Sequence, residues 1–114
     1  MSEGQIVVTG ASKGIGLAIA DELARRGFQV VSLSRSGGGV GTPIICDMTD
    51  EDAVREAFRQ IASAGPVIGL VNNAGIHIGG SISTLSTADF NKTMALNATA
   101  VMVAAREAYP FLKE

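Results

Sequence analysis

A glycine-rich turn near the amino terminus constrains the fold of this chain more than any other feature. The turn runs from Thr9 to Gly16 with the sequence Thr-Gly-Ala-Ser-Lys-Gly-Ile-Gly, and an apolar segment at residues 5–8 precedes it. After the turn begins, the apolar residues Ile15, Ile19 and Leu23 recur at helical spacing. The pattern therefore predicts a buried strand, a tight turn and a helix in that order.

A turn of this kind between a strand and a helix is suited to bind an anion. Its backbone N–H groups gather at the positive end of the helix dipole, where a pyrophosphate is stabilised. We expect Gly10 to permit the tight turn, Gly14 to let a phosphate approach the backbone, and Gly16 to let the helix pack closely on the strand. Three glycines alone are a weak signal, so their meaning depends on the rest of the chain.

Composition and charge limit the class of protein. The 114 residues suffice for one domain with a buried core, and we find no linker or internal repeat. A hydrophobic content of 46% with 18% charged residues excludes intrinsic disorder, and a net charge of -2 provides no basic surface for nucleic acid. No apolar segment is long enough to span a bilayer, and the start of the chain lacks the basic residues of a signal peptide.

The single cysteine and the single histidine bear on compartment and metal binding. Cys46 has no partner for an internal disulfide, which is typical of a reducing cytoplasm, and its place at the end of an apolar strand predicts a buried, unreactive thiol. His77 is predicted to be a solvated loop residue. With one Cys, one His and scattered carboxylates, the sequence contains no metal-ligand cluster.

Strand and helix patterns alternate along the whole chain. Gly27 is expected to end the first helix in the left-handed conformation, and Thr49 is expected to cap the second helix with Asp52 completing a capping box. The glycine-rich tract at 36–41 is predicted to be a flexible loop. The alternation predicts an α/β fold in which helices cover both faces of a parallel sheet. The predicted strands are 5–9, 28–34, 43–46 and 67–71, and the predicted helices are about 14–26, 49–64 and 86–112.

Apolar side chains mark one side of each of the later helices. In the second helix this side is predicted to be buried. The third helix is opened by Ser86 and Asp89 at capping-box spacing. The stripe residues are Val54, Phe58 and Ile61 in the second helix, and Phe90, Met94, Val101 and Ala105 in the third.

Further segments combine with the glycine turn into a family resemblance. Asp47 follows the third predicted strand, Asn-Asn-Ala-Gly at 72–75 follows the fourth, and Asn97 lies in the last helix. Together with Thr-Gly-x-x-x-Gly-x-Gly at 9–16, these residues closely resemble the short-chain dehydrogenase/reductase family, from residue 6 to about residue 113. The resemblance implies a Rossmann-type three-layer sandwich with strand order 3-2-1-4, forming one dinucleotide-binding domain over residues 1–114.

The residues after the second predicted strand bear on the choice of cofactor. NAD-selective sites place a carboxylate there for the ribose 2′-hydroxyl, whereas this chain has Ser34 and Arg35 with no Asp or Glu nearby. A guanidinium can hold a 2′-phosphate by bidentate hydrogen bonds, and the resemblance places Lys13 at the same corner. These two cations favour NADP, with NAD as the alternative. The competing interpretation makes Arg35 a solvated loop charge and Lys13 an ordinary residue at a helix start.

The resemblance also implies contacts to the rest of the cofactor. Asp47 would accept a hydrogen bond from the adenine amino group beside the Met48 amide, and the same carboxylate can also cap the helix that follows. The turn at 73–75 would abut the adenosine ribose. The cofactor-binding residues implied in this way are Thr9, Gly10, Ser12, Lys13, Gly14, Ile15, Gly16, Ser34, Arg35, Asp47, Met48, Asn73, Ala74 and Gly75.

Residues for catalysis are only partly present. Asn97 matches the helix asparagine that holds a water near the catalytic lysine in this family, and a purely structural role fits the sequence equally well. Tyr109 and Lys113 have the spacing of the family's Tyr-x-x-x-Lys pair. We reject them because the serine expected before them is absent and Pro110 disturbs the helix. Family members carry the serine and the Tyr-x-x-x-Lys pair in later segments, and this sequence ends at Glu114 before them.

Three interpretations of function remain. In the first, the chain is the cofactor-binding part of an NADP-dependent oxidoreductase, which transfers hydride between nicotinamide and a carbonyl or alcohol substrate only when completed by a C-terminal part. The second makes it a non-catalytic dinucleotide-binding module. The third makes it an assembly unit, because the fourth strand would present an open apolar edge, which predicts a homo-oligomer in any case. We favour the first because it also accounts for Asn97.

Overall fold

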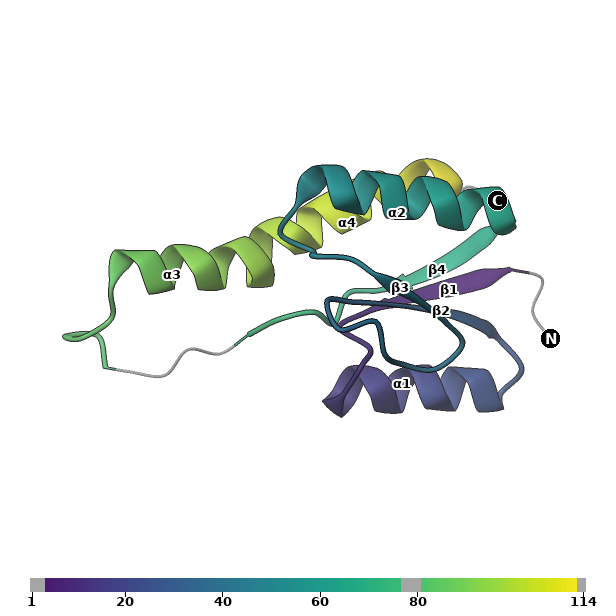
Figure 1. Ribbon diagram of the computed structural model, residues 1–114, viewed down its shortest axis with the longest axis horizontal. Helices are drawn as coiled ribbons and strands as arrows, with labels where there is room; N and C mark the ends of the chain where they lie inside the picture. The colour runs from purple at the N-terminus through teal and green to yellow at the C-terminus, as the bar shows by residue number, and fades with distance from the viewer. Residues whose placement is uncertain (1–3, 77–80, 113–114) are drawn as a thin grey trace.

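The computed structural model describes residues 4–76 and 81–112, which form a parallel sheet between two helical layers (Figure 1). The four strands lie in the order β3-β2-β1-β4, and every neighbouring pair is parallel. The predicted fold and strand order are confirmed. The strands are β1 (Gln5–Thr9), β2 (Gln29–Ser34), β3 (Thr42–Ile45) and β4 (Val67–Val71).

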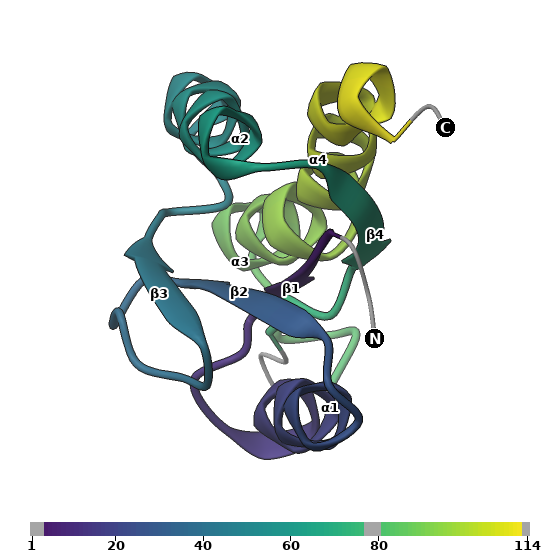
Figure 2. The same ribbon diagram turned by 90° about the vertical axis from the view of Figure 1, so that its right-hand side faces the viewer.

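Helices lie on both faces of the sheet. Helix α1 (Gly14–Arg25) lies on one face, and α2 (Glu51–Ala64) and α4 (Ala100–Ala108) lie side by side on the other (Figures 1 and 2). The predicted third helix is a continuous helical path, but its hydrogen-bonding pattern changes along the path. Helix α3 (Thr87–Met94) leads into the π-helical segment η1 (Ala95–Thr99), then α4, then a 3-10 turn η2 (Tyr109–Phe111).

The core divides between the two faces of the sheet. The larger part packs the strands against α2 and α4, and it contains the predicted stripe of α2, whose three side chains are at most 2% exposed. The smaller part lies under α1. The larger cluster includes Val7, Val31, Leu33, Val54, Phe58, Ile61, Val103 and Ala104, and the smaller one includes Val8, Ala11, Ala20 and Val30.

Two of the other helices bury small residues rather than the large ones that mark their apolar side. In α1, Ile15 is 73% exposed, whereas Gly16 and Ala20 are buried against the sheet. Along the third helical path, Phe90 and Met94 are exposed, and the buried residues of α4 are Val103 and the alanines at 100, 104 and 108. Phe90 and Met94 belong to α3, which extends beyond the sheet (Figure 1) and buries none of its residues.

Of the two predicted helix caps, Ser86 and Thr49, one is confirmed. Ser86 caps α3, where its side chain accepts the N–H of Asp89 at 3.0 Å. The cap of α2 is Asp50, which accepts the N–H of Ala53 at 3.1 Å, so the expectation of a Thr49 cap was wrong. Thr49 is held instead by the carboxylate of Asp47, and the N-cap lies one residue later than predicted.

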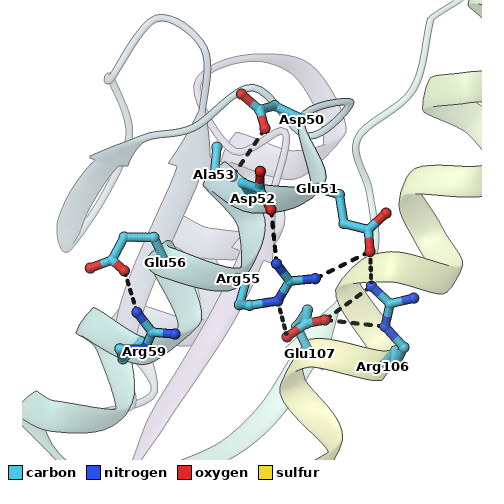
Figure 3. A network of polar contacts seen from close by, with 9 residues as sticks. All are labelled: Asp50, Glu51, Asp52, Ala53, Arg55, Glu56, Arg59, Arg106 and Glu107. Atoms are coloured by element: carbon cyan, nitrogen blue, oxygen red, sulfur yellow. Dashed lines mark hydrogen bonds and ion pairs between the residues drawn. The ribbon is translucent and has the colours of Figure 1, made fainter.

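Ion pairs on the surface connect α2 with α4 (Figure 3). Arg106 Nη2 lies 2.6 Å from Glu51 Oε2, and Arg55 Nε lies 3.6 Å from Glu107 Oε1. Exposed pairs of this kind contribute little to stability, so the apolar packing beneath them holds the two helices together.

Cys46 lies at the end of β3 and is 3% exposed. Burial, followed by the nearby charges of Asp47 and Asp50, raises the pKa of its thiol to about 11. The protonated thiol is a poor nucleophile and metal ligand, which fits the predicted unreactive role. The described residues contain no cluster of three or more potential metal ligands. Within the same ranges, no helix has the length and apolar character needed to cross a membrane. His77 lies outside the described residues.

Candidate functional site

The predicted cofactor residues meet at the carboxyl ends of the strands. The glycine turn follows β1, Arg35 follows β2, Asp47 follows β3, and the turn at 73–75 follows β4. Because all four strands are parallel, these segments lie at one end of the sheet, where α1 and α2 begin (Figure 1). Ligands of open α/β sheets bind at this edge, where the connections diverge to opposite faces.

The glycine turn has the geometry that its sequence predicts. Gly10 has φ +64°, and a Cβ there would lie 2.8 Å from Ala74 Cα. A Cβ on Gly16 would overlap the carbonyl oxygen of Gly10 and the side-chain nitrogen of Asn73. Gly14 has φ +62°, and apart from its chain neighbours and the backbone of its own helix, no heavy atom of the described chain lies within 4 Å of where its Cβ would be. Gly10 and Gly16 are therefore required by packing, whereas Gly14 leaves open space beside the backbone.

The start of α1 faces this open space. Its N-cap residue is Lys13, which has extended backbone angles, and no described side chain caps the helix. The first N–H groups of a helix have no intrahelical acceptor and carry the positive end of the helix dipole. Lys13 itself is exposed, so its charge adds to an edge that already favours an anion.

Thr9 ties the glycine turn to the turn after β4. Its hydroxyl is fully buried and accepts the N–H groups of Asn73 and Ala74, each at 3.0 Å. The side chain of Asn73 donates to the carbonyl oxygen of Gly10 at 3.1 Å. The side chains of Thr9 and Asn73 thus position the two turns relative to each other.

Ser34 and Arg35 differ in what their side chains can contact. Ser34 is 6% exposed, and its hydroxyl accepts the N–H of Gly37 at 3.0 Å, so it is bonded within the loop that follows. Arg35 is exposed and near enough to Asp47 to contribute to its lowered pKa. Of the two, only Arg35 presents a free polar end at the edge of the sheet.

Asp47 is exposed, and one oxygen of its carboxylate accepts hydrogen bonds. Its Oδ1 accepts the N–H of Thr49 at 3.0 Å and the hydroxyl of Thr49 at 2.7 Å, and these two bonds are the main cause of its lowered pKa. The carboxylate is therefore ionised, and its turn leads into α2 without capping it. Met48 is 5% exposed with its side chain in the core, so only its backbone can meet a ligand.

Asn97 lies in the middle of the π-helical segment η1. Its Oδ1 accepts the N–H of Ile76 at 2.8 Å, and its Nδ2 donates to the carbonyl oxygen of Ile76 at 2.7 Å. The amide thus holds the segment that leaves the Asn-Asn-Ala-Gly turn. Short π-helical segments are frequent at functional sites because they change the direction of a side chain. The contacts support the structural role of Asn97 that the sequence left open.

Tyr109 lies outside the segments that follow the four strands. It is 70% exposed and begins η2, directly after α4. That end of α4 lies at the amino ends of the strands, opposite to the start of α1 (Figure 1). The position supports the rejection of Tyr109 as a catalytic residue, and Lys113 lies outside the described residues.

Some residues at this edge were missed by the sequence analysis. Gly38 and Gly39 lie against Ser12 and Ala11 of the glycine turn. The loop that contains them was predicted only as a flexible connection. The signal that could have indicated them is the short distance in sequence between β2 and β3, which leaves little chain for a crossing helix.

Comparison with known proteins identifies the family. Residues 5–114 match the family model described as short chain dehydrogenase. The chain belongs to this family. MabA of Mycobacterium tuberculosis, a 3-oxoacyl-(acyl-carrier-protein) reductase, is 38% identical over 109 residues, covering 90% of this chain and 43% of MabA. The gluconate 5-dehydrogenase of Gluconobacter oxydans is 35% identical over 115 residues, covering 89% of this chain and 45% of that enzyme.

Solved structures agree with this assignment. The ligand-free aldohexose dehydrogenase of Thermoplasma acidophilum superimposes with a TM-score of 0.91 and 33% identity over 96% of this chain and 44% of that one. A short chain dehydrogenase of Burkholderia cenocepacia in complex with NADP gives a TM-score of 0.88 and 36% identity, over 97% of this chain and 51% of that one. The chain therefore spans about half the length of the relatives that it matches.

Proposed function

We propose that this chain forms the NADP-binding part of an oxidoreductase of the short-chain dehydrogenase type. The observation that carries the proposal is the open edge at Gly14, where an uncapped helix start and unobstructed backbone face the same space. A pyrophosphate is the kind of group that such an edge accepts. When bound, the nicotinamide cofactor would supply hydride chemistry toward a carbonyl or alcohol.

The choice of NADP over NAD rests on the charges beside this edge. Arg35 and Lys13 are both exposed there, and the sequence places no carboxylate between β2 and β3 that could accept the ribose 2′-hydroxyl. Asp47 and the Met48 backbone would face the adenine, and the turn at 73–75 would face the ribose. The complex of the Burkholderia cenocepacia relative with NADP supports the same choice.

A non-catalytic dinucleotide-binding module is the second candidate. Two observations favour it for these 114 residues: Asn97 is bonded to Ile76 through both ends of its amide, and Tyr109 follows α4, whose end lies at the opposite end of the sheet from the start of α1. Under either candidate the cofactor edge is the same. The two candidates differ in whether the chain, together with any further segment, supports hydride transfer to a substrate.

We expect the isolated 114-residue chain to be inactive toward carbonyl substrates. The measurement is the loss of NADPH absorbance in the presence of a panel of ketones and aldehydes, with Tyr109→Phe as the matched variant. No turnover above a protein-free control is the expected result for both proteins. Turnover that disappears in Tyr109→Phe would restore Tyr109 as the acid, and turnover that survives it would show that the chemistry needs no tyrosine here.

We also propose that the chain forms a homo-oligomer in the cytoplasm. Among the described strands, β4 is paired only with β1, and Ile68 within it is 49% exposed. An unpaired apolar edge seeks a partner strand, so light scattering is expected to give at least a dimer mass. A monomer at high concentration would contradict this expectation.

The proposal of a cytoplasmic location rests on the single buried Cys46, and cell fractionation would test it.

A further inference from the structure

A groove crosses the amino ends of β1, β2 and β3, at the end of the sheet opposite to the proposed cofactor edge (Figure 2). Its volume is about 410 Å³, within the range of about 300–1,000 Å³ that is usual for small-molecule sites. Val30 lines it from the α1 side of the sheet and Val31 from the α2 side, so the groove joins the two helical layers. Its polar lining residues are Gln5, Gln29 and Thr42.

Gln5 is the buried polar residue of this groove. It is 9% exposed, and its Nε2 donates to the carbonyl oxygens of Ile61 at 2.9 Å and Gly65 at 3.0 Å. Its Oε1 accepts no hydrogen bond from the described residues. Since no fully buried polar side-chain atom of the described chain lacks a partner, solvent reaches this oxygen. Gln5 therefore offers the groove an acceptor that the two bonds to the backbone hold in place.

The end of α2 adds negative potential to the same groove. Ala64, the last residue of α2, lines it. The first turn of α2 contains the acidic residues Glu51 and Asp52, but the last turn contains no basic residue to offset the negative end of the helix dipole. Pro66 also has no N–H to donate to the last carbonyl groups of the helix. This corner of the groove therefore favours a cation that can donate hydrogen bonds.

We propose that the groove binds a primary ammonium group carried on a short alkyl chain. An ammonium has three N–H donors, which suit the Gln5 oxygen and the carbonyl groups at the end of α2. The alkyl chain would lie against Phe28 and the valines of the groove. A free alkylamine and a lysine side chain of another protein both present this chemistry. Among the described residues, none of those proposed to bind the cofactor lines the groove, so the inference is independent of the proposed function.

The test titrates the ¹⁵N-labelled chain with n-butylammonium chloride and, separately, with Nα-acetyl-lysine methylamide, followed by two-dimensional NMR. We expect saturable shifts of the side-chain amide signals of Gln5 and Gln29, with a millimolar dissociation constant for so small a ligand. The uncharged analogue 1-butanol should bind at least about tenfold more weakly. Shifts with both amines would support a lysine side chain as a ligand, and shifts with butylammonium alone would support a free amine.

Two variants test the residues of the groove. Gln5→Met keeps the length of the side chain and removes its oxygen, so it should lower the affinity for butylammonium about tenfold. Ala64→Arg serves if that variant does not fold. It places a tethered cation at the end of α2, which should abolish butylammonium binding and raise thermal stability. Ser63→Arg is the matched control, because Ser63 is exposed in the same turn and does not line the groove.

The control should lower the affinity for butylammonium less than about threefold, since solvent and salt screen an exposed charge. Equal affinities for butylammonium and 1-butanol, no saturable shift at Gln5, or equal losses in Ala64→Arg and Ser63→Arg would overturn the inference. These outcomes leave the proposed function standing, because NADPH is proposed to bind at the other end of the sheet.

Discussion

The variant Gly16→Ala is expected to lose dinucleotide binding almost completely. An added Cβ would overlap the carbonyl oxygen of Gly10 and the side-chain nitrogen of Asn73, which are themselves joined by a hydrogen bond. Both atoms belong to the turns that form the cofactor edge, so the overlap can be relieved only by moving that edge. We expect an affinity loss of more than about a hundredfold, equivalent to two charge-assisted hydrogen bonds to phosphate. Forcing the extra carbon into this contact should also cost about 1–3 kcal/mol of stability.

The measurement for this variant is calorimetry on protein whose fold has been checked by circular dichroism. Gly69→Ala in β4 is the matched control, because an added Cβ there meets Ile6 at the ordinary distance of 3.5 Å. This control should bind NADPH as the unchanged chain does. If Gly16→Ala binds as tightly as the control, the pyrophosphate does not lie at the start of α1.

The variant Arg35→Asp is expected to exchange the cofactor preference of the chain. The substitution removes the cation proposed to hold the 2′-phosphate and introduces a carboxylate, which repels that phosphate but can accept hydrogen bonds from a ribose 2′-hydroxyl. The affinity for NADPH should fall about a hundredfold, and the affinity for NADH should stay the same or rise.

A charge reversal elsewhere separates a local effect from a change in net charge. Arg59→Asp on α2 changes the net charge equally, and Arg59 pairs only locally with Glu56 among the described residues, at 2.7 Å. It should leave both affinities unchanged. Equal losses of NADPH and NADH affinity in Arg35→Asp would mean that Arg35 supports the fold or the general electrostatic potential. That result would remove the basis for choosing NADP.

The elements that the sequence predicted well are those with strong local signals. The strand β4 is a short run without charge, and the glycine turn lies between an apolar segment and a helical pattern, so both were placed within a residue of their observed positions. The parallel sheet and its order followed from the alternation of strands and helices together with the family resemblance.

Other features depend on packing that the sequence does not encode locally. Thr49 and Asp50 are both good caps, but the hydroxyl of Thr49 bonds to Asp47, and Asp50 caps α2. The buried side of α4 consists mainly of alanines, which a search for large apolar residues passes over. The change of register at η1 has no counterpart in the sequence pattern, since its residues continue a helical spacing.

For the site, the hydrogen-bond partners of the polar side chains could not be predicted from the sequence. Thr9 and Ser34 were expected at the cofactor edge and Asn97 in a catalytic or structural role, and their side chains bond to Ala74, Gly37 and Ile76, respectively. Which polar group faces a ligand and which one holds a neighbouring turn depends on distances across the sheet. Those distances are set by long-range packing rather than by spacing along the chain.

The most direct test of the account is a calorimetric titration of the unchanged 114-residue chain with NADPH and, separately, with NADH. We predict saturable binding of NADPH with an affinity at least about tenfold above that for NADH, as one charge-assisted contact to the 2′-phosphate would give. Saturable binding of neither cofactor, under conditions where circular dichroism shows a folded chain, would contradict the claim that these residues form a dinucleotide site.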